Sequence, residues 1–132
     1  MFIFGLYFTY YRPKLNAFNK FKNDPDFTNY MLIIESNSVF DKKSYDKAIK
    51  HIKLFLMFYS ESMENEKTNE MFYKMQHQHN KIIKYLNRML FSIPNSMRRY
   101  TYMQISISNL DNIFKSYIEK IANKANITYT NI

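Results

Sequence analysis

Six basic side chains in the second half of the chain have the types and spacing of a polyanion-binding surface. On a helix, the first four recur at intervals of seven, three and four residues and therefore form one stripe. Such a stripe neutralises phosphates, with Tyr85, Tyr100 and Tyr102 offering faces on which bases stack. An acidic protein surface would suit the same cations equally well. The six residues are Lys74, Lys81, Lys84, Arg88, Arg98 and Arg99.

The distribution of charge supports this interpretation, but the composition offers another. Residues 1–66 carry nine basic and eight acidic side chains, whereas residues 67–132 carry ten and three, within a net charge of +8. No carboxylate occurs from Met71 to Leu110, so this stretch creates a positive field. However, Asn, Lys, Ile, Tyr and Phe make up 69 of the 132 residues, which is typical of AT-rich genomes. A solvated lysine face on an amphipathic helix is therefore the alternative interpretation.

The chain lacks the residues that several other kinds of functional site need. The chain has one Gly and no Cys, whereas phosphate-cradling loops need several glycines and thiol nucleophiles or thiolate zinc sites need cysteine. His77 and His79 are two residues apart, so on a helix they point away from each other. We expect His79 to be a partly buried member of an apolar stripe. The sequence thus predicts no catalytic residue, no metal site, no cofactor and no small-molecule substrate.

The first two predicted helices begin at capping carboxylates. Asp24 followed by Pro25 predicts a helix that runs to about residue 35, because a carboxylate caps the free amides and proline suits the first turn. Asp41 is expected to cap a second helix, whose apolar stripe extends from residue 45 to Met63. On this second helix, Lys43, Lys47 and Lys50 are expected on the opposite, solvent face.

The second half of the chain predicts two more helices. Residues 64–70 are polar and predict a tight connection, with Thr68 as the cap of a third helix that ends at Pro94 and pairs antiparallel with the second. Asn95 or Ser96 is expected to cap the next segment. Residues 101–107 alternate like a strand, but residues 97–125 keep a spacing of three and four, and we choose the helix. A restart at residue 108, with Asp111 completing a capping box, is the alternative.

The first eleven residues are almost wholly apolar. As a helix they would rise only about 16 Å, too little to span a bilayer, and they lack the basic leader and cleavage site of a secretory signal. Three interpretations remain: an extended arm packed on this protein or a neighbour, a helix that completes the core, or a membrane-surface anchor. The candidate hydrophobic interface, which shares one face if the arm is extended, consists of Phe2, Phe4, Leu6, Phe8 and Tyr10.

These patterns predict an all-α fold with a single domain. Residues 1–23 form an apolar N-terminal arm and connector, residues 24–125 an antiparallel bundle of about four helices, and residues 126–132 a C-terminal tail. Because 46% of the residues are apolar, we expect some apolar surface to be covered by a protein partner or by copies of the chain.

The predicted helical hairpin also carries a resemblance. Residues 41–94 include DKKSYDKAIKHIKLFLMFY and FYKMQHQHNKIIKYLNRMLFSIPN, and with the AT-rich residue usage they resemble small, lineage-restricted helical proteins of the nucleocytoplasmic large DNA viruses. The resemblance implies a minor capsid or virion-associated protein, located in the virion or host cytoplasm. It carries over no functional residue.

The sequence therefore predicts a non-enzymatic structural or interaction protein, with virion assembly as its most concrete form. The alternative is a small basic nucleic-acid-binding protein. We expect protein partners or self-association, no transmembrane span and no secretion; otherwise the chain is expected in the cytoplasm.

Deleting residues 2–11 tests the role of the arm. If the arm is an interface, the truncated chain is expected to lose assembly or solubility in sedimentation experiments while keeping its helical circular dichroism. A truncated chain that stays soluble but melts at a much lower temperature would instead make the arm part of the core.

Overall fold

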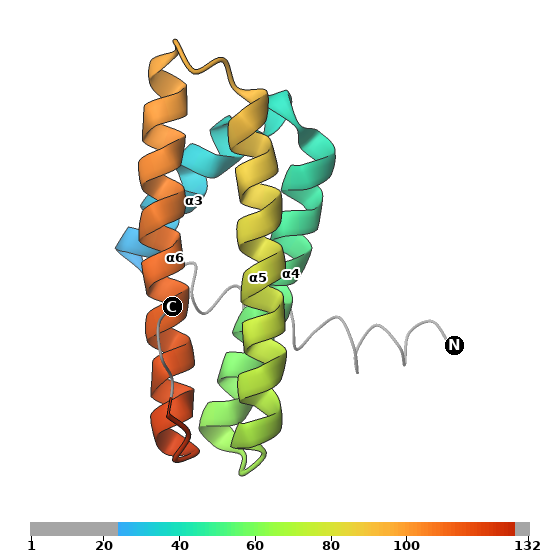
Figure 1. The fold of residues 1–132 in the computed structure, drawn as a ribbon, viewed down its shortest axis with the longest axis vertical. Coiled ribbons are helices and arrows are strands. Elements are labelled where there is room, and N and C mark those ends of the chain that lie inside the picture. Colours follow the sequence, from blue (N-terminus) through green and yellow to red (C-terminus); the bar gives the residue numbers. More distant parts are fainter. Residues whose placement is uncertain (1–23, 129–132) are drawn as a thin grey trace, which may run out of the picture.

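The computed structural model of the protein describes residues 24–128, which contain four α-helices and no strand. The predicted all-α bundle is therefore confirmed (Figure 1). The elements are α3 (Pro25–Ser36), the short 3-10 helix η2 (Ser38–Phe40), α4 (Lys42–Glu64), α5 (Thr68–Ser92) and α6 (Arg98–Lys124).

Three long helices make the body of the bundle. α4 and α5 form the antiparallel hairpin that the sequence predicts, and α6 returns along α5 after the Pro94 turn (Figure 1). The shorter α3 packs mainly on α6, in the half of the bundle that contains this turn. Side chains from α4 and α5 therefore share one long, two-helix face.

The capping carboxylates start α3 and α4 as predicted. The Asp24 carboxylate accepts hydrogen bonds from the backbone amides of Asp26 at 3.0 Å and Phe27 at 3.3 Å. Asp41 accepts from the amide of Ser44 at 3.1 Å and from its hydroxyl at 2.7 Å. The hydrogen bonds from Ser44 hold the pKa of Asp41 below its usual value.

The predicted caps of the other two helices are wrong. Thr68 is the first residue of α5 and is buried, and the preceding Lys67 gives no side-chain cap. α6 begins at Arg98, after Met97, rather than next to Asn95 or Ser96. The helix begins later in the sequence than predicted because the amide of Met97 donates a hydrogen bond to the Pro94 carbonyl at 3.0 Å. This hydrogen bond closes a turn that precedes the helix.

Residues 101–107, whose apolar spacing suits either a strand or a helix, lie inside α6, as predicted. Met103 and Ile107 are buried, but Ile105 between them is 52% exposed, which is the burial period of a helix rather than of a strand. The helix does not restart at Ser108. Asp111 therefore has no capping role, and its carboxylate instead bonds His79 of α5.

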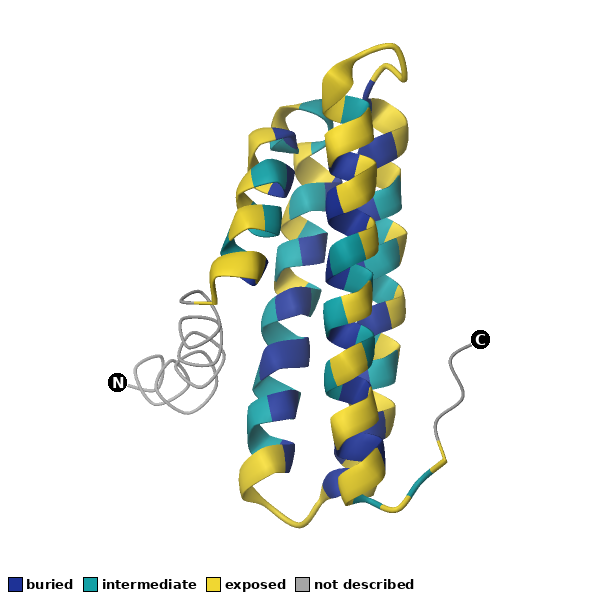
Figure 2. Cartoon of the chain, turned by 90° about the vertical axis from the view of Figure 1, so that its left-hand side faces the viewer, coloured by how far each residue is buried: buried dark blue, intermediate teal, exposed yellow. Residues whose placement is uncertain are grey.

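The core is centred on the ring of Phe114, which no solvent reaches. The ring centroid of Phe114 lies 6.4 Å from Phe27 of α3, 4.8 Å from Phe55 of α4 and 6.2 Å from His79 of α5. These side chains come from all four helices. Figure 2 shows the buried residues as an inward-facing band along the bundle.

Met63, the last residue of the apolar stripe predicted for α4, lies outside this core. Met63 is 52% exposed, whereas its neighbour Ser62 is fully buried. The Lys124 ammonium of α6 donates to the carbonyls of Ser62 at 2.6 Å and Met63 at 3.1 Å. The last turn of α4 is thus held by hydrogen bonds from the Lys124 side chain to its backbone carbonyls rather than by burial of Met63.

Truncating a core side chain between α4 and α5 tests the hairpin. Leu86 is fully buried, so Leu86→Ala is expected to lower the free energy of unfolding by about 2–5 kcal/mol in urea titrations. Lys50→Ala, on the exposed face of α4, is the control and should change stability by less than about 0.5 kcal/mol. Equal effects of the two substitutions would contradict this packing.

Candidate functional site

The structure divides the six candidate basic residues among separate places. Lys74 pairs with Glu70 one turn earlier on α5, at 2.9 Å. The Arg99 guanidinium donates to the Ser36 carbonyl at 3.2 Å and so joins α6 to the end of α3. Lys81 is half-buried and Arg98 is exposed. Lys84 and Arg88 remain together and both approach the ring of Tyr85.

Tyr85 gathers cations from two helices. The charged groups of Lys84 and Arg88 on α5 and Lys47 on α4 lie 5.6, 5.4 and 5.4 Å from its ring centroid. The ring of His51, also on α4, stacks on Tyr85 at 5.7 Å with an interplanar angle of 9°. We call these five residues the Tyr85 cluster. Cation–π attraction at such an exposed place stabilises each contact by about 0.5–1 kcal/mol.

Two members of the Tyr85 cluster, Lys47 and His51, were not predicted from the sequence to lie at this site. Lys47 was expected on the solvent face of the second helix, but it is half-buried against Tyr85. The error has a physical reason, because a long lysine stem covers a neighbouring helix while its ammonium stays near water. His51, one turn after Lys47, carried no signal of its own. The informative pattern is the recurrence of basic residues on both helices of an antiparallel pair.

No carboxylate neutralises the cations of the Tyr85 cluster within residues 24–128. Lys47, Lys84 and Arg88 form no ion pair with any described side chain. Arg88 is near enough to Asp41 to lower the pKa of this carboxyl, so Asp41 offsets part of the charge of Arg88 without forming an ion pair. The cluster therefore keeps a net positive charge that no ion pair with a described residue cancels.

A second group of polar residues joins α5 to α6 inside the bundle. Nε2 of His79 lies 2.7 Å from Oδ1 of Asp111. The Lys115 ammonium lies 2.8 Å from the other carboxylate oxygen, Oδ2. His79 is buried, as the sequence predicts, and its ring packs near Phe55 and Phe114. Burial, helped by the charge of Lys115, lowers the pKa of His79 against the opposing hydrogen bond and charge of Asp111. This arrangement fits a neutral, structural histidine.

A groove of about 360 Å³ runs between α5 and α6 near the Pro94 turn. Phe91, which is 75% exposed, lies at this groove. The remaining lining residues combine apolar side chains, Ile83, Leu90, Tyr100 and Ile107, with polar ones, Asn87, Gln104, Ser108 and Asp111. The groove therefore offers apolar surface together with hydrogen-bonding groups.

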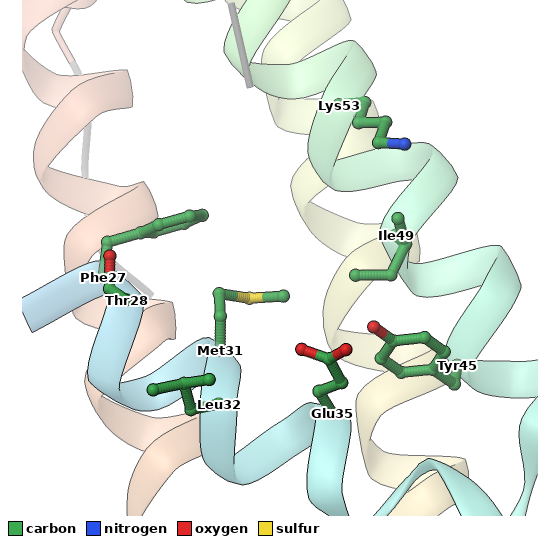
Figure 3. A pocket seen from close by; sticks show the side chains of 8 residues that line it. All are labelled: Phe27, Thr28, Met31, Leu32, Glu35, Tyr45, Ile49 and Lys53. Carbon is green, nitrogen blue, oxygen red and sulfur yellow. The ribbon is translucent and has the colours of Figure 1, made fainter. Parts of the chain in front are cut away.

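Another groove, of about 260 Å³, separates α3 from α4 (Figure 3). Met31 of α3 points toward Ile49 of α4, and the Glu35 carboxylate points toward the Tyr45 hydroxyl. Burial, and to a smaller extent the charge of Glu35, raises the pKa of Tyr45. The groove thus combines apolar side chains with the hydroxyls of Thr28 and Tyr45 and with two charged side chains, Glu35 and Lys53.

The remaining predictions concern the arm, metals and membranes. The candidate interface Phe2, Phe4, Leu6, Phe8 and Tyr10 lies outside the described residues. Within residues 24–128, no three His, Asp or Glu side chains converge as metal ligands. None of the described helices contains a stretch long and apolar enough to cross a membrane.

Comparison with known proteins adds no relative. No protein-family model, no curated protein and no solved structure matches the chain.

The lowered pKa of His79 predicts a dependence of stability on pH. The His79 imidazole binds a proton more readily in the unfolded chain than in the folded one. The contribution of neutral His79 to the free energy of unfolding is therefore fully present above about pH 6.5. It is lost as the pH falls through the pKa of His79 in the folded state. Urea titrations at about pH 7.5 and about pH 5.5 should show the loss, because histidine titrates in this window.

Two substitutions identify the residue responsible. His79→Gln is expected to flatten the dependence of the unfolding free energy on pH, whereas His77→Gln, at an exposed position of the same helix, should leave it unchanged. An equal flattening by both substitutions would contradict the assignment to His79.

Proposed function

We propose that the protein is a non-enzymatic structural and interaction protein that takes an amphipathic helix of a partner protein into the α5–α6 groove. The observation that carries the proposal is Phe91, a large apolar side chain that stays 75% exposed at this groove. Phenylalanine in such a place gains about 1.5–3 kcal/mol when a partner covers it.

The dimensions of the groove favour a helix as the occupant. Its lining extends from Ile83 to Phe91 on α5 and from Tyr100 to Asp111 on α6. At 1.5 Å per residue these stretches measure about 12 and about 16 Å, or roughly two to three helical turns. Apolar side chains at helical spacing on a partner are typical occupants of such a groove.

The polar lining supports specific binding rather than unselective adhesion. Asn87, Gln104 and Ser108 offer donors and acceptors beside the apolar surface. Their side chains satisfy polar groups of the correct partner and leave those of a wrong partner unpaired.

The concrete setting that we propose is the assembly of a large DNA virus, with the chain as a minor capsid or virion-associated component. This part of the proposal is supported by the resemblance of residues 41–94 alone. It places the protein in the virion or in the host cytoplasm.

Replacing Phe91 tests the proposed function. Tagged full-length chain, expressed in its native source, is expected to retain one partner protein at about 0.5 M salt, where exposed charges are strongly screened. Phe91→Ser is expected to reduce the retained amount about tenfold or more, since the lost burial exceeds about 1.4 kcal/mol.

A matched control lies on the same helix. Tyr73 is 62% exposed and precedes Phe91 by 18 residues, or five helical turns, so it lies on the same side of α5 but outside the groove. Tyr73→Ser should leave retention unchanged. The proposal is wrong if quantitative mass spectrometry finds no retained protein, or equal retention by the Phe91→Ser chain.

A further inference from the structure

We propose that the Tyr85 cluster binds the phosphate backbone of a nucleic acid. This inference uses residues on the α4–α5 face and does not depend on the α5–α6 groove. The two proposals therefore fail or succeed separately.

Like charge is concentrated at the cluster. The charged groups of Lys47, Lys84 and Arg88 all lie within 5.6 Å of one ring centroid, so no two are farther apart than twice that distance. This upper bound is comparable with the Debye length of about 10 Å at about 0.1 M salt, so the cations add to one local potential. No ion pair with a described residue cancels it.

The side chains of the cluster are also held in position before any ligand binds. Free lysine and arginine side chains lose rotamer entropy when a ligand orders them. Here the Tyr85 ring already attracts the three charged groups, and the stacked His51 ring holds Tyr85 in turn, with Nδ1 of His51 2.5 Å from Oε1 of Gln78. An anion that binds here meets cations which are already gathered.

The spacing of the cations fits a nucleic-acid strand. Lys84 and Arg88 lie about 6 Å apart along α5, Lys47 of α4 approaches the same ring, and a nucleic-acid strand carries one charge per about 3.4 Å of helix axis. The three cations therefore suit about three neighbouring phosphates. Because His51 stacks on the Tyr85 ring and cations surround it, base stacking on that ring is not expected. Recognition should consequently be independent of base sequence.

Fluorescence anisotropy of a short labelled DNA duplex measures this binding with the full chain. With three phosphate contacts, the affinity should fall about 40-fold between 50 and 200 mM salt. Lys84→Gln/Arg88→Gln leaves one of these contacts, so its affinity should fall only about three- to fourfold over the same range. Its affinity at 50 mM salt should also be weaker than that of the natural chain.

The control has the same net charge. Lys67→Gln/Lys120→Gln removes two exposed cations outside the cluster and should keep the steep salt dependence. Tyr85→Leu changes no charge, but it should weaken binding because the cations are no longer gathered, whereas Tyr85→Phe should bind normally. Thermal melts confirm that each variant is folded.

Several results would overturn the proposal. They are the absence of binding at low salt, an equal loss in the Lys67→Gln/Lys120→Gln control, and unchanged binding by Tyr85→Leu. Competition by polyglutamate that matches DNA of equal charge would assign the face to an acidic protein instead. Competition by inorganic phosphate that matches DNA would assign it to a small free anion.

Discussion

Phe114 is the contact on which the rest of the structure depends, because its ring is where the four helices meet. It packs against Phe27 of α3, Phe55 of α4 and His79 of α5 while projecting from α6. Buried aromatic pairs add about 0.5–1.5 kcal/mol beyond the area that they bury. Their edge-on geometry, with interplanar angles of 76°, 61° and 64°, also favours one arrangement of the helices. The contacts of Phe114 therefore stabilise the bundle and fix how its helices are aligned.

This alignment produces the surface chemistry. Once Phe55 of α4 lies near His79 of α5, the antiparallel direction brings residues before Phe55 beside residues after His79. His51 and Lys47, one and two turns before Phe55, consequently meet Tyr85. Arg88 follows Tyr85 by three residues on α5 and approaches its ring, whereas Phe91 lies on the α5–α6 side. A single internal packing arrangement thus gives the bundle a basic face and an apolar groove on different sides of α5.

Most of the fold follows from local rules that operate within a few residues. Capping by Asp24 and Asp41 and the helical spacing of apolar residues predict the helices and their antiparallel pairing, and both are confirmed. The Thr68 cap was wrong because burial took precedence over capping. Three of the five residues of the Tyr85 cluster could be foreseen, since Lys84, Tyr85 and Arg88 lie on one helix. Lys47 and His51 could not, because their place depends on the register between two helices, which no local pattern contains.

The central claim is that the register of α4 against α5 assembles the Tyr85 cluster from two helices. Nuclear Overhauser contacts of the Tyr85 ring protons in the full-length chain test it most directly. The account predicts strong contacts to the ring protons of His51 and to the side-chain methylenes of Lys47, both on α4. Contacts from Tyr85 to residues of α5 alone would contradict it.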